Sequence, residues 1–145
     1  MKKLEFDYHL VCDLETDGLL DECTQIWCIV AKDVKSGRVF EAGPGEIHKV
    51  LNLMLKCPVV SFHNALKFDI PVINKLYSNF MEHYTGTVVD TLLLSKMLDA
   101  DRRAPKGCRG GHSIKAWGLR FKMHKPVHED WTQFSPEMLH RCRED

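Results

Sequence analysis

The segment LVCDLETDG, residues 10–18, decides how the rest of this chain is interpreted. An apolar run, residues 10–12, leads into Asp13 and Glu15, and a Thr-Asp-Gly turn follows. Side chains alternate between the two faces of a β-strand, so Asp13 and Glu15 point the same way. Adjacent carboxylates repel each other, and Mg²⁺ or Mn²⁺, which prefer hard oxygen ligands, would relieve that repulsion. The segment predicts a metal site at a strand end, although a solvated acidic strand end gives the same short pattern.

Length and composition indicate an ordinary globular protein. The chain has 145 residues, and we expect residues 1–145 to form one domain with a buried core. The sequence shows no apolar run of membrane-span length and no signal-peptide core, so we expect no membrane partner and a cytoplasmic location. Its six cysteines include no C-x-x-C pair, which favours reduced thiols, several of them buried in apolar segments.

Charge is unevenly distributed, although the formal net charge is zero. Acidic residues concentrate before residue 23, whereas residues 102–125 carry eight Lys or Arg and no Asp or Glu. This division suits a polyanion held over metal ions, and a solvated charged face is the alternative. We expect phosphate contacts from four residues of the basic segment: Arg109, Lys115, Arg120 and Lys122.

Hydrophobic periodicity predicts alternating strands and helices. Strands are expected over residues 8–15, 26–33, 39–42, 59–62 and 87–89. Helices are expected over residues 46–56, 70–77 and 91–98, with one or two turns at 113–117 and a last helix from Pro136. A hairpin turn at residues 35–38 makes the first strands antiparallel. The order predicts an α/β fold with a mixed sheet of about five strands flanked by helices.

Three segments place acids or amides at the end of an apolar element, namely residues 13–15, 61–69 and 140–145. Their order resembles the three motifs of the DEDD exonuclease superfamily, in which D-x-E is the first motif. Asn64, Phe68 and Asp69 match the second motif, N-x-x-x-[FY]-D, and Asp145 matches the Asp that ends the third. The runs HNALKFDIPVINKL, DTLLLSKML, GHSIKAWG and W-x-x-F-S-P-E-M-L, in that order, extend the resemblance to the proofreading domain of tailed-phage family A DNA polymerases.

The resemblance implies an RNase H-like fold and a 3′–5′ exonuclease that acts on single-stranded or frayed DNA ends. It places the protein in phage replication, in a bacterial or phage-infected cell, with two Mg²⁺ or Mn²⁺ ions and a DNA polymerase as a candidate partner. The implied metal ligands are Asp13, which would bridge both ions, with Glu15, Asp69 and Asp145. The implied contacts to the substrate strand are Leu14, Thr16, Leu19, Asn64 and Phe68. His63, beside Asn64, is either a structural residue of the joint or a further contact to the strand. RNA is an alternative substrate, because no residue that reads a 2′-hydroxyl is identifiable.

The third motif departs from the resembled family. One branch of the superfamily has Tyr four residues before the final Asp, where this chain has Arg141, and the other has His five before it, as His140 does. On a continuous helix, a spacing of four keeps two residues on one face, whereas a spacing of five does not. A helix already running at His140 would turn Arg141 toward the metals, whereas a later or distorted start would make His140 the catalytic base. The sequence leaves both assignments open.

Two further interpretations remain open. In the resembled family the last helix continues for several turns beyond its Asp, so the helix ending at Asp145 looks cut short. This favours either one part of a split polymerase or a catalytically weak or inactive module that binds nucleic acid or a polymerase. A loose set of nitrogen and sulfur ligands also gives a weak zinc pattern, formed by Cys108, His112, His124 and His128.

Overall fold

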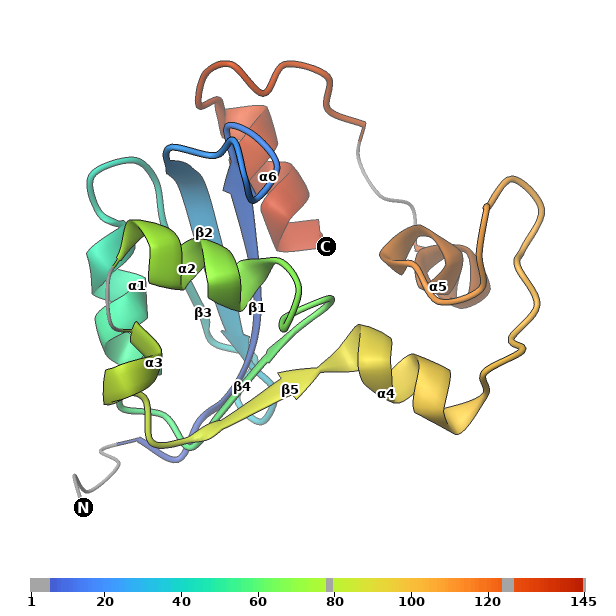
Figure 1. The fold of residues 1–145 in the computed structure, drawn as a ribbon, viewed down its shortest axis with the longest axis horizontal. Helices are drawn as coiled ribbons and strands as arrows, with labels where there is room; N and C mark the ends of the chain where they lie inside the picture. The colour runs from blue at the N-terminus through green and yellow to red at the C-terminus, as the bar shows by residue number, and fades with distance from the viewer. Residues whose placement is uncertain (1–5, 78–79, 124–126, 145) are drawn as a thin grey trace.

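A mixed five-stranded sheet with the order β3-β2-β1-β4-β5 organises the molecule, and helices flank it (Figure 1). The computed structural model describes residues 6–77, 80–123 and 127–144. The strands are β1 (His9–Thr16), β2 (Ile26–Asp33), β3 (Val39–Ala42), β4 (Val59–Phe62) and β5 (Thr87–Asp90). The helices are α1 (Ile47–Met54), α2 (Asp69–Leu76), α3 (Phe80–His83), α4 (Thr91–Leu98), α5 (Ile114–Phe121) and α6 (Pro136–Glu144). The predicted α/β class and strand number are confirmed.

The sheet changes direction at its central strand. β1 pairs antiparallel with β2, and β2 with β3, whereas β1–β4 and β4–β5 are parallel pairs. The predicted hairpin turn joins β2 to β3: the Asp33 carboxylate accepts from the Ser36 backbone N–H at 2.7 Å, and Gly37 has a positive φ of 72°. The carboxyl ends of the parallel strands therefore meet beside the end of β1, where Asp13 and Glu15 lie.

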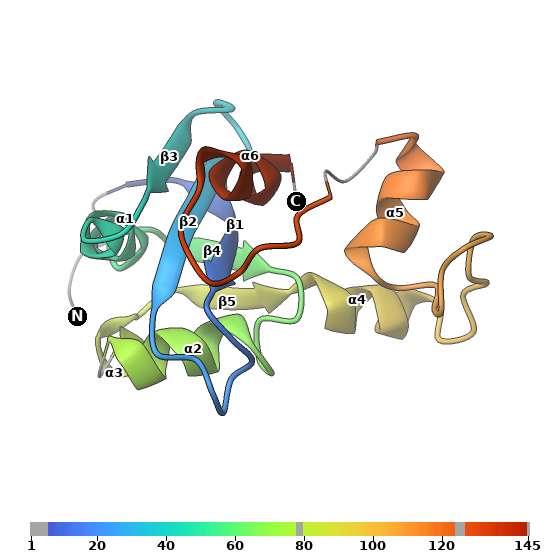
Figure 2. The ribbon, with the colours of Figure 1, turned by 90° about the horizontal axis from the view of Figure 1, so that it is seen from above.

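Two apolar clusters cover the two faces of the sheet. The larger one joins β1 residues such as Leu10 and Leu14 to α1 and α2. The smaller one contains Cys28 and Val30 of β2 with Met138 and Cys142 of α6. Figure 2 shows α6 and α2 on opposite sides of β1 and β2. Burial of both faces explains why β2 is apolar along nearly its whole length instead of alternating.

The predicted elements differ from the observed ones mainly at their ends. α5 extends to Phe121, four residues beyond the expected turns, and ends where Lys122 adopts a left-handed conformation with φ 58°. The short helix α3 was not predicted, because four residues are too few to show a helical period. Ser135 caps α6 as expected, accepting from the Met138 backbone N–H at 3.1 Å. The cysteines are free, five of them buried, as expected.

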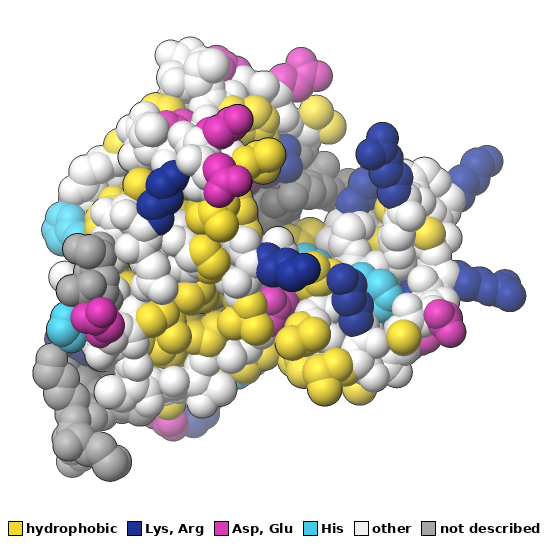
Figure 3. Space-filling model, viewed as in Figure 1, with side chains coloured by type: hydrophobic (Ala, Val, Ile, Leu, Met, Phe, Trp, Pro, Cys, Tyr) yellow, Lys and Arg dark blue, Asp and Glu magenta, His cyan; other side chains and the backbone are white. Residues whose placement is uncertain are grey.

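Residues 91–123, which we call the arm, comprise α4, a loop and α5, and they extend away from the sheet (Figure 1). Lys and Arg side chains gather over this half of the molecule, next to exposed hydrophobic side chains (Figure 3). The arm thus carries most of the basic segment identified in the sequence. Within the described residues, no helix has the length and apolar character needed to cross a membrane.

Candidate active site

Strand register places Asp13 and Glu15 on the face of the sheet that α6 covers. Asp13 pairs with Val30, and Glu15 with Cys28, and directly paired residues share one face. Val30 and Cys28 belong to the cluster under α6, and the Cys142 thiol of α6 donates to the Asp13 carbonyl oxygen at 3.4 Å. Both carboxylates are therefore half-buried beside the last helix instead of projecting from a fully solvated strand end.

A register shift lies immediately after Glu15. Thr16 pairs with Ile26 while Glu15 pairs with Cys28, so Trp27 is the extra residue of a bulge in β2. The Trp27 indole donates to the Trp131 carbonyl oxygen at 2.9 Å, which fastens the segment before α6 to this bulge. The bulge thereby helps to fix where α6 crosses Glu15.

Arg141, not His140, faces the acidic strand end. Arg141 Nε lies 3.5 Å from Glu15 Oε1, and both side chains are largely buried, at 18% and 14% exposed. The Arg141 guanidinium also lies over the Trp131 ring, 4.8 Å from its centroid. α6 begins at Pro136, so the helix is already running at His140, whose side chain is exposed. The geometry gives no support to His140 as a base at this site.

Asp69 begins α2 and is only 3% exposed. Burial, together with the charges of Asp90 and Glu15, raises the pKa of Asp69 to about 7, against the opposing hydrogen bond from its own backbone. Because β1 and β4 are parallel neighbours, the second motif, which follows β4, lies at the same end of the sheet as the first. With a pKa of about 7, Asp69 takes up a proton readily near neutral pH, and a bound cation would favour its ionised form.

Asp90 has two roles. It caps α4, as predicted, and it also holds the turn that leads to Asp69, which was not predicted. Its carboxylate accepts from the backbone N–H groups of Leu92 and Leu93, as an N-cap does, at 3.0 and 3.1 Å. It also accepts from those of Asn64 and Leu66, at 3.2 and 3.1 Å. These hydrogen bonds outweigh burial and lower the pKa of Asp90. One carboxylate therefore joins the start of α4 to the second motif.

His63 and Asn64 are held in this turn by their neighbours. His63 Nδ1 lies 3.0 Å from Thr91 Oγ1, which also contacts the Phe62 carbonyl oxygen. Asn64 has a positive φ of 76°, a conformation that Asn tolerates better than most residues. Its carbonyl oxygen accepts from the Phe68 N–H at 3.0 Å, and the half-buried Phe68 ring packs against the larger apolar cluster. The turn is preorganised by backbone contacts.

The predicted contacts that follow β1 divide into core and surface residues. Leu14 is 3% exposed and belongs to the core, on the opposite face from Asp13, so only its backbone remains for a substrate contact. Thr16 is also buried, and its hydroxyl donates to the Gly18 carbonyl oxygen at 2.7 Å. Leu19, in contrast, is 73% exposed at the rim. The Lys75 ammonium of α2 supports this loop by donating to the next carbonyl oxygen, that of Leu20, at 2.8 Å.

The donor set fits a hard divalent cation in chemistry, although the described residues alone do not complete a site. Asp13, Glu15 and Asp69 offer only carboxylate oxygens, and burial, with the charges of Asp90 and Glu15, raises the pKa of Asp69. Asp145, the fourth predicted ligand, lies outside the described residues. Among the residues that are described, no three His, Cys, Asp or Glu side chains form a group that could hold a metal ion.

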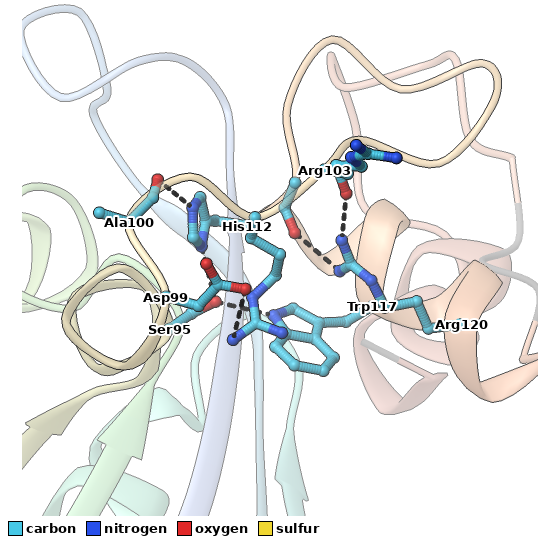
Figure 4. A network of polar contacts seen from close by, with 9 residues as sticks. Ser95, Asp99, Ala100, Arg103, His112, Trp117 and Arg120 are labelled. Atoms are coloured by element: carbon cyan, nitrogen blue, oxygen red, sulfur yellow. Dashed lines mark hydrogen bonds and ion pairs between the residues drawn. The ribbon is translucent and has the colours of Figure 1, made fainter.

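The zinc pattern gains no support from the geometry. His124 lies outside the described residues. Both ring nitrogens of His112 have other neighbours, Ser95 Oγ at 2.8 Å and the Ala100 carbonyl oxygen at 3.3 Å. These contacts assign His112 to the arm's internal structure (Figure 4).

The arm is fastened internally by side chains that bind backbone carbonyls. Arg120, predicted to contact phosphate, instead donates to the carbonyl oxygens of Gly111 and Arg103, both at 2.7 Å (Figure 4). It also lies over the Trp117 ring, so its role here is structural. Lys115 is exposed and donates to the Gly107 carbonyl oxygen at 3.0 Å, which leaves its ammonium able to reach a phosphate as well.

Comparison with known proteins establishes the fold class. No protein-family model matches this chain, and a search of curated proteins finds no match. Solved structures that match include E. coli exonuclease I in complex with a dT13 oligonucleotide, with a TM-score of 0.63 and 11% sequence identity. The match covers 94% of this chain but only 39% of the exonuclease I chain. At this identity the likeness shows the fold alone, an RNase H-like α/β fold.

Proposed function

We propose that this protein is a divalent-metal-dependent 3′–5′ exonuclease of the DEDD type. The observation that carries the proposal is that β1 and β4 are parallel neighbours, so Asp13 and Glu15, near the end of β1, lie at the same end of the sheet as the turn from β4 to Asp69. The likeness in fold to exonuclease I supports the same reading.

The cations, two Mg²⁺ or Mn²⁺ ions, would supply an activated water and stabilise the leaving 3′-oxygen of a phosphodiester. Asp13, Glu15, Asp69 and Asp145 are the residues proposed to hold them. Asp13 and Glu15 come from the central strand and are each paired with a residue of β2, so sheet pairing fixes the backbone between them. Asp69 comes from a helix start that Asp90 holds through the preceding turn. Strand pairing and the Asp90 hydrogen bonds thus hold the backbone that carries Asp13, Glu15 and Asp69.

The proposed substrate is the 3′ end of a single-stranded or frayed DNA. The similar structure of exonuclease I holds an oligothymidylate, and an exposed Leu19 beside a preorganised Asn64 turn would suit a terminal nucleotide here. RNA remains an alternative polymer. A role in phage replication, with a DNA polymerase as partner in the cytoplasm, is proposed from the sequence resemblance.

Arg141 favours a second candidate function, a module that binds nucleic acid without hydrolysing it. Its guanidinium lies against Glu15, where it neutralises a proposed metal ligand, and Arg is always protonated and cannot serve as a base. In the exonuclease reading, the same guanidinium would orient a phosphate or water.

The test is incubation of a 5′-labelled single-stranded DNA with Mg²⁺ or Mn²⁺, with EDTA as the control. Exonuclease activity gives a ladder that shortens from the 3′ end and disappears in EDTA. An intact oligonucleotide that is nevertheless bound identifies the non-catalytic module. The same oligonucleotide as RNA then reports the preferred polymer.

A further inference from the structure

An apolar groove separates the sheet from the arm. It has a volume of about 600 Å³ and is open to solvent at its surface. Its lining residues come mainly from three elements and include Val11 and Asp13 of β1, Leu94 and Leu98 of α4, and Trp117 and Phe121 of α5. The presence of Asp13 makes the groove continuous with the candidate active site.

Phe121 forms a rigid aromatic surface in this groove. Its side chain is 66% exposed, yet its ring stacks on Trp117 with centroids 5.6 Å apart and planes inclined by 18°. Trp117 is fixed in turn: its indole donates to Ser95 Oγ at 3.2 Å, and Arg102 and Arg120 lie over its ring. An exposed ring held in place by its neighbours loses little conformational freedom when a planar group stacks on it.

The arm that carries this aromatic surface is basic, whereas the charged residues that line the groove itself are Asp13 and Glu144. The segment from residue 102 to residue 123 contains no Asp or Glu, and several of its cations are exposed: Arg103, Lys106, Arg109, Lys115 and Lys122. Figure 3 shows Lys and Arg side chains gathered over the arm. Aromatic rings beside a basic surface are the combination by which proteins hold single strands without reading sequence.

We propose that the groove binds the bases of a single-stranded nucleic acid, with Phe121 as a stacking platform and the exposed cations of the arm on its phosphates. The inference rests on the proposed function for direction: the 3′ end lies at Asp13, and the nucleotides before it occupy the groove. An acidic amphipathic helix of another polypeptide would also suit Leu94 and Leu98. Continuity with Asp13 and the basic surroundings favour the nucleic acid.

The test measures binding of a fluorescein-labelled oligothymidylate of about 12 nucleotides by anisotropy in EDTA, where no hydrolysis occurs. Phe121→Ala should weaken binding about 10-fold, the effect expected of losing one stacked base. Phe121→Trp should restore it. The matched control is Leu119→Ala on the same helix, because Leu119 is 36% exposed and does not line the groove. Thermal melts by circular dichroism confirm that each variant is folded.

A second measurement separates this inference from the proposed function. With Mn²⁺, Phe121→Ala should raise KM for the oligothymidylate by a larger factor than KM for the p-nitrophenyl ester of thymidine 5′-monophosphate, because that substrate has only one nucleotide. If the wild-type protein hydrolyses neither substrate but binds the oligothymidylate in a way that depends on Phe121, the proposed exonuclease function is overturned and the proposed role of the groove is supported. Equal binding by the wild-type protein and Phe121→Ala, or no binding by the wild-type protein, overturns the proposal that the groove binds nucleic acid. Either result favours a polypeptide as its occupant.

Discussion

The acidic sheet edge and the arm are built on different physical principles. At the edge, Asp13 and Glu15 are fixed by strand pairing and by α6, and Asp69 is buried at the start of α2. In the arm, hydrogen bonds from His112 and Arg120 to carbonyl oxygens hold the loop, and apolar residues such as Met97 and Leu98 remain 73% and 81% exposed. The edge therefore offers fixed geometry for chemistry, whereas the arm offers an accessible surface for binding.

The largest expected effect comes from removing a carboxylate at the edge. Asp13→Asn should reduce Mn²⁺-dependent hydrolysis by roughly 1,000-fold or more, because a proposed metal ligand is lost. Binding of the oligothymidylate in EDTA should persist, since the arm is intact. Asp21→Asn, which changes an exposed acid nearby in the same way, is the control. Equal loss in both variants would show that net charge, not the site, is responsible.

Asp69 makes the stability of the metal-free protein depend on pH. Its pKa is about 7 in the folded protein, above the ordinary value of 3.8, so the folded state binds the proton more tightly than the unfolded state does. Stability should therefore fall as pH rises from about 4 to about 7, by at most about 4 kcal/mol. Chemical denaturation across this range measures it, and Asp69→Asn should flatten the dependence. A slope that is unchanged in Asp69→Asn would assign it to another group.

Asp90 links the two regions, because it binds both the second-motif turn and the start of α4. Asp90→Ala leaves four backbone N–H groups without this acceptor and should cost about 3 kcal/mol of stability. Asp90→Ser retains a cap for α4 but is too short to reach the turn at Asn64 as well. The serine variant should recover part of the stability yet remain impaired in hydrolysis, as measured by melts and by the ladder assay. Full recovery of both would reduce Asp90 to a helix cap.

A smaller effect is expected within the arm. Arg120→Gln should cost about 1–2 kcal/mol locally, because two carbonyl oxygens lose a charged donor and the Trp117 ring loses a cation. Hydrogen exchange should quicken in α5 while β1 keeps its protection, since the arm contributes little to the sheet. Arg109→Gln, at an exposed arm position, is the control. Faster exchange throughout the sheet would show that the arm and the edge unfold together.

Local sequence predicted the elements well where a single signal dominates. The strands of the hairpin, the caps at Asp90 and Ser135 and the face shared by Asp13 and Glu15 follow from alternation, turn chemistry and side-chain hydrogen bonding. These interactions join residues that are near one another in the chain, so a short segment of sequence is enough to predict them. The predicted length of α5 was wrong, because the helix continues to Phe121. It ends where Lys122 adopts a left-handed conformation, which the residue type lysine does not predict.

Contacts between distant segments were decided only by the tertiary structure. The position of each residue around the α6 helix places Arg141, not His140, next to Glu15. The side chain of Leu14 is buried in the core. Arg120 binds carbonyl oxygens of a loop that comes close to it only when the arm is folded, so it was wrongly predicted to contact phosphate. The sequence by itself determined which residues carry charge and which stretches form strands. Only packing in three dimensions decided which charges meet, because burial and pairing depend on neighbours remote in the chain.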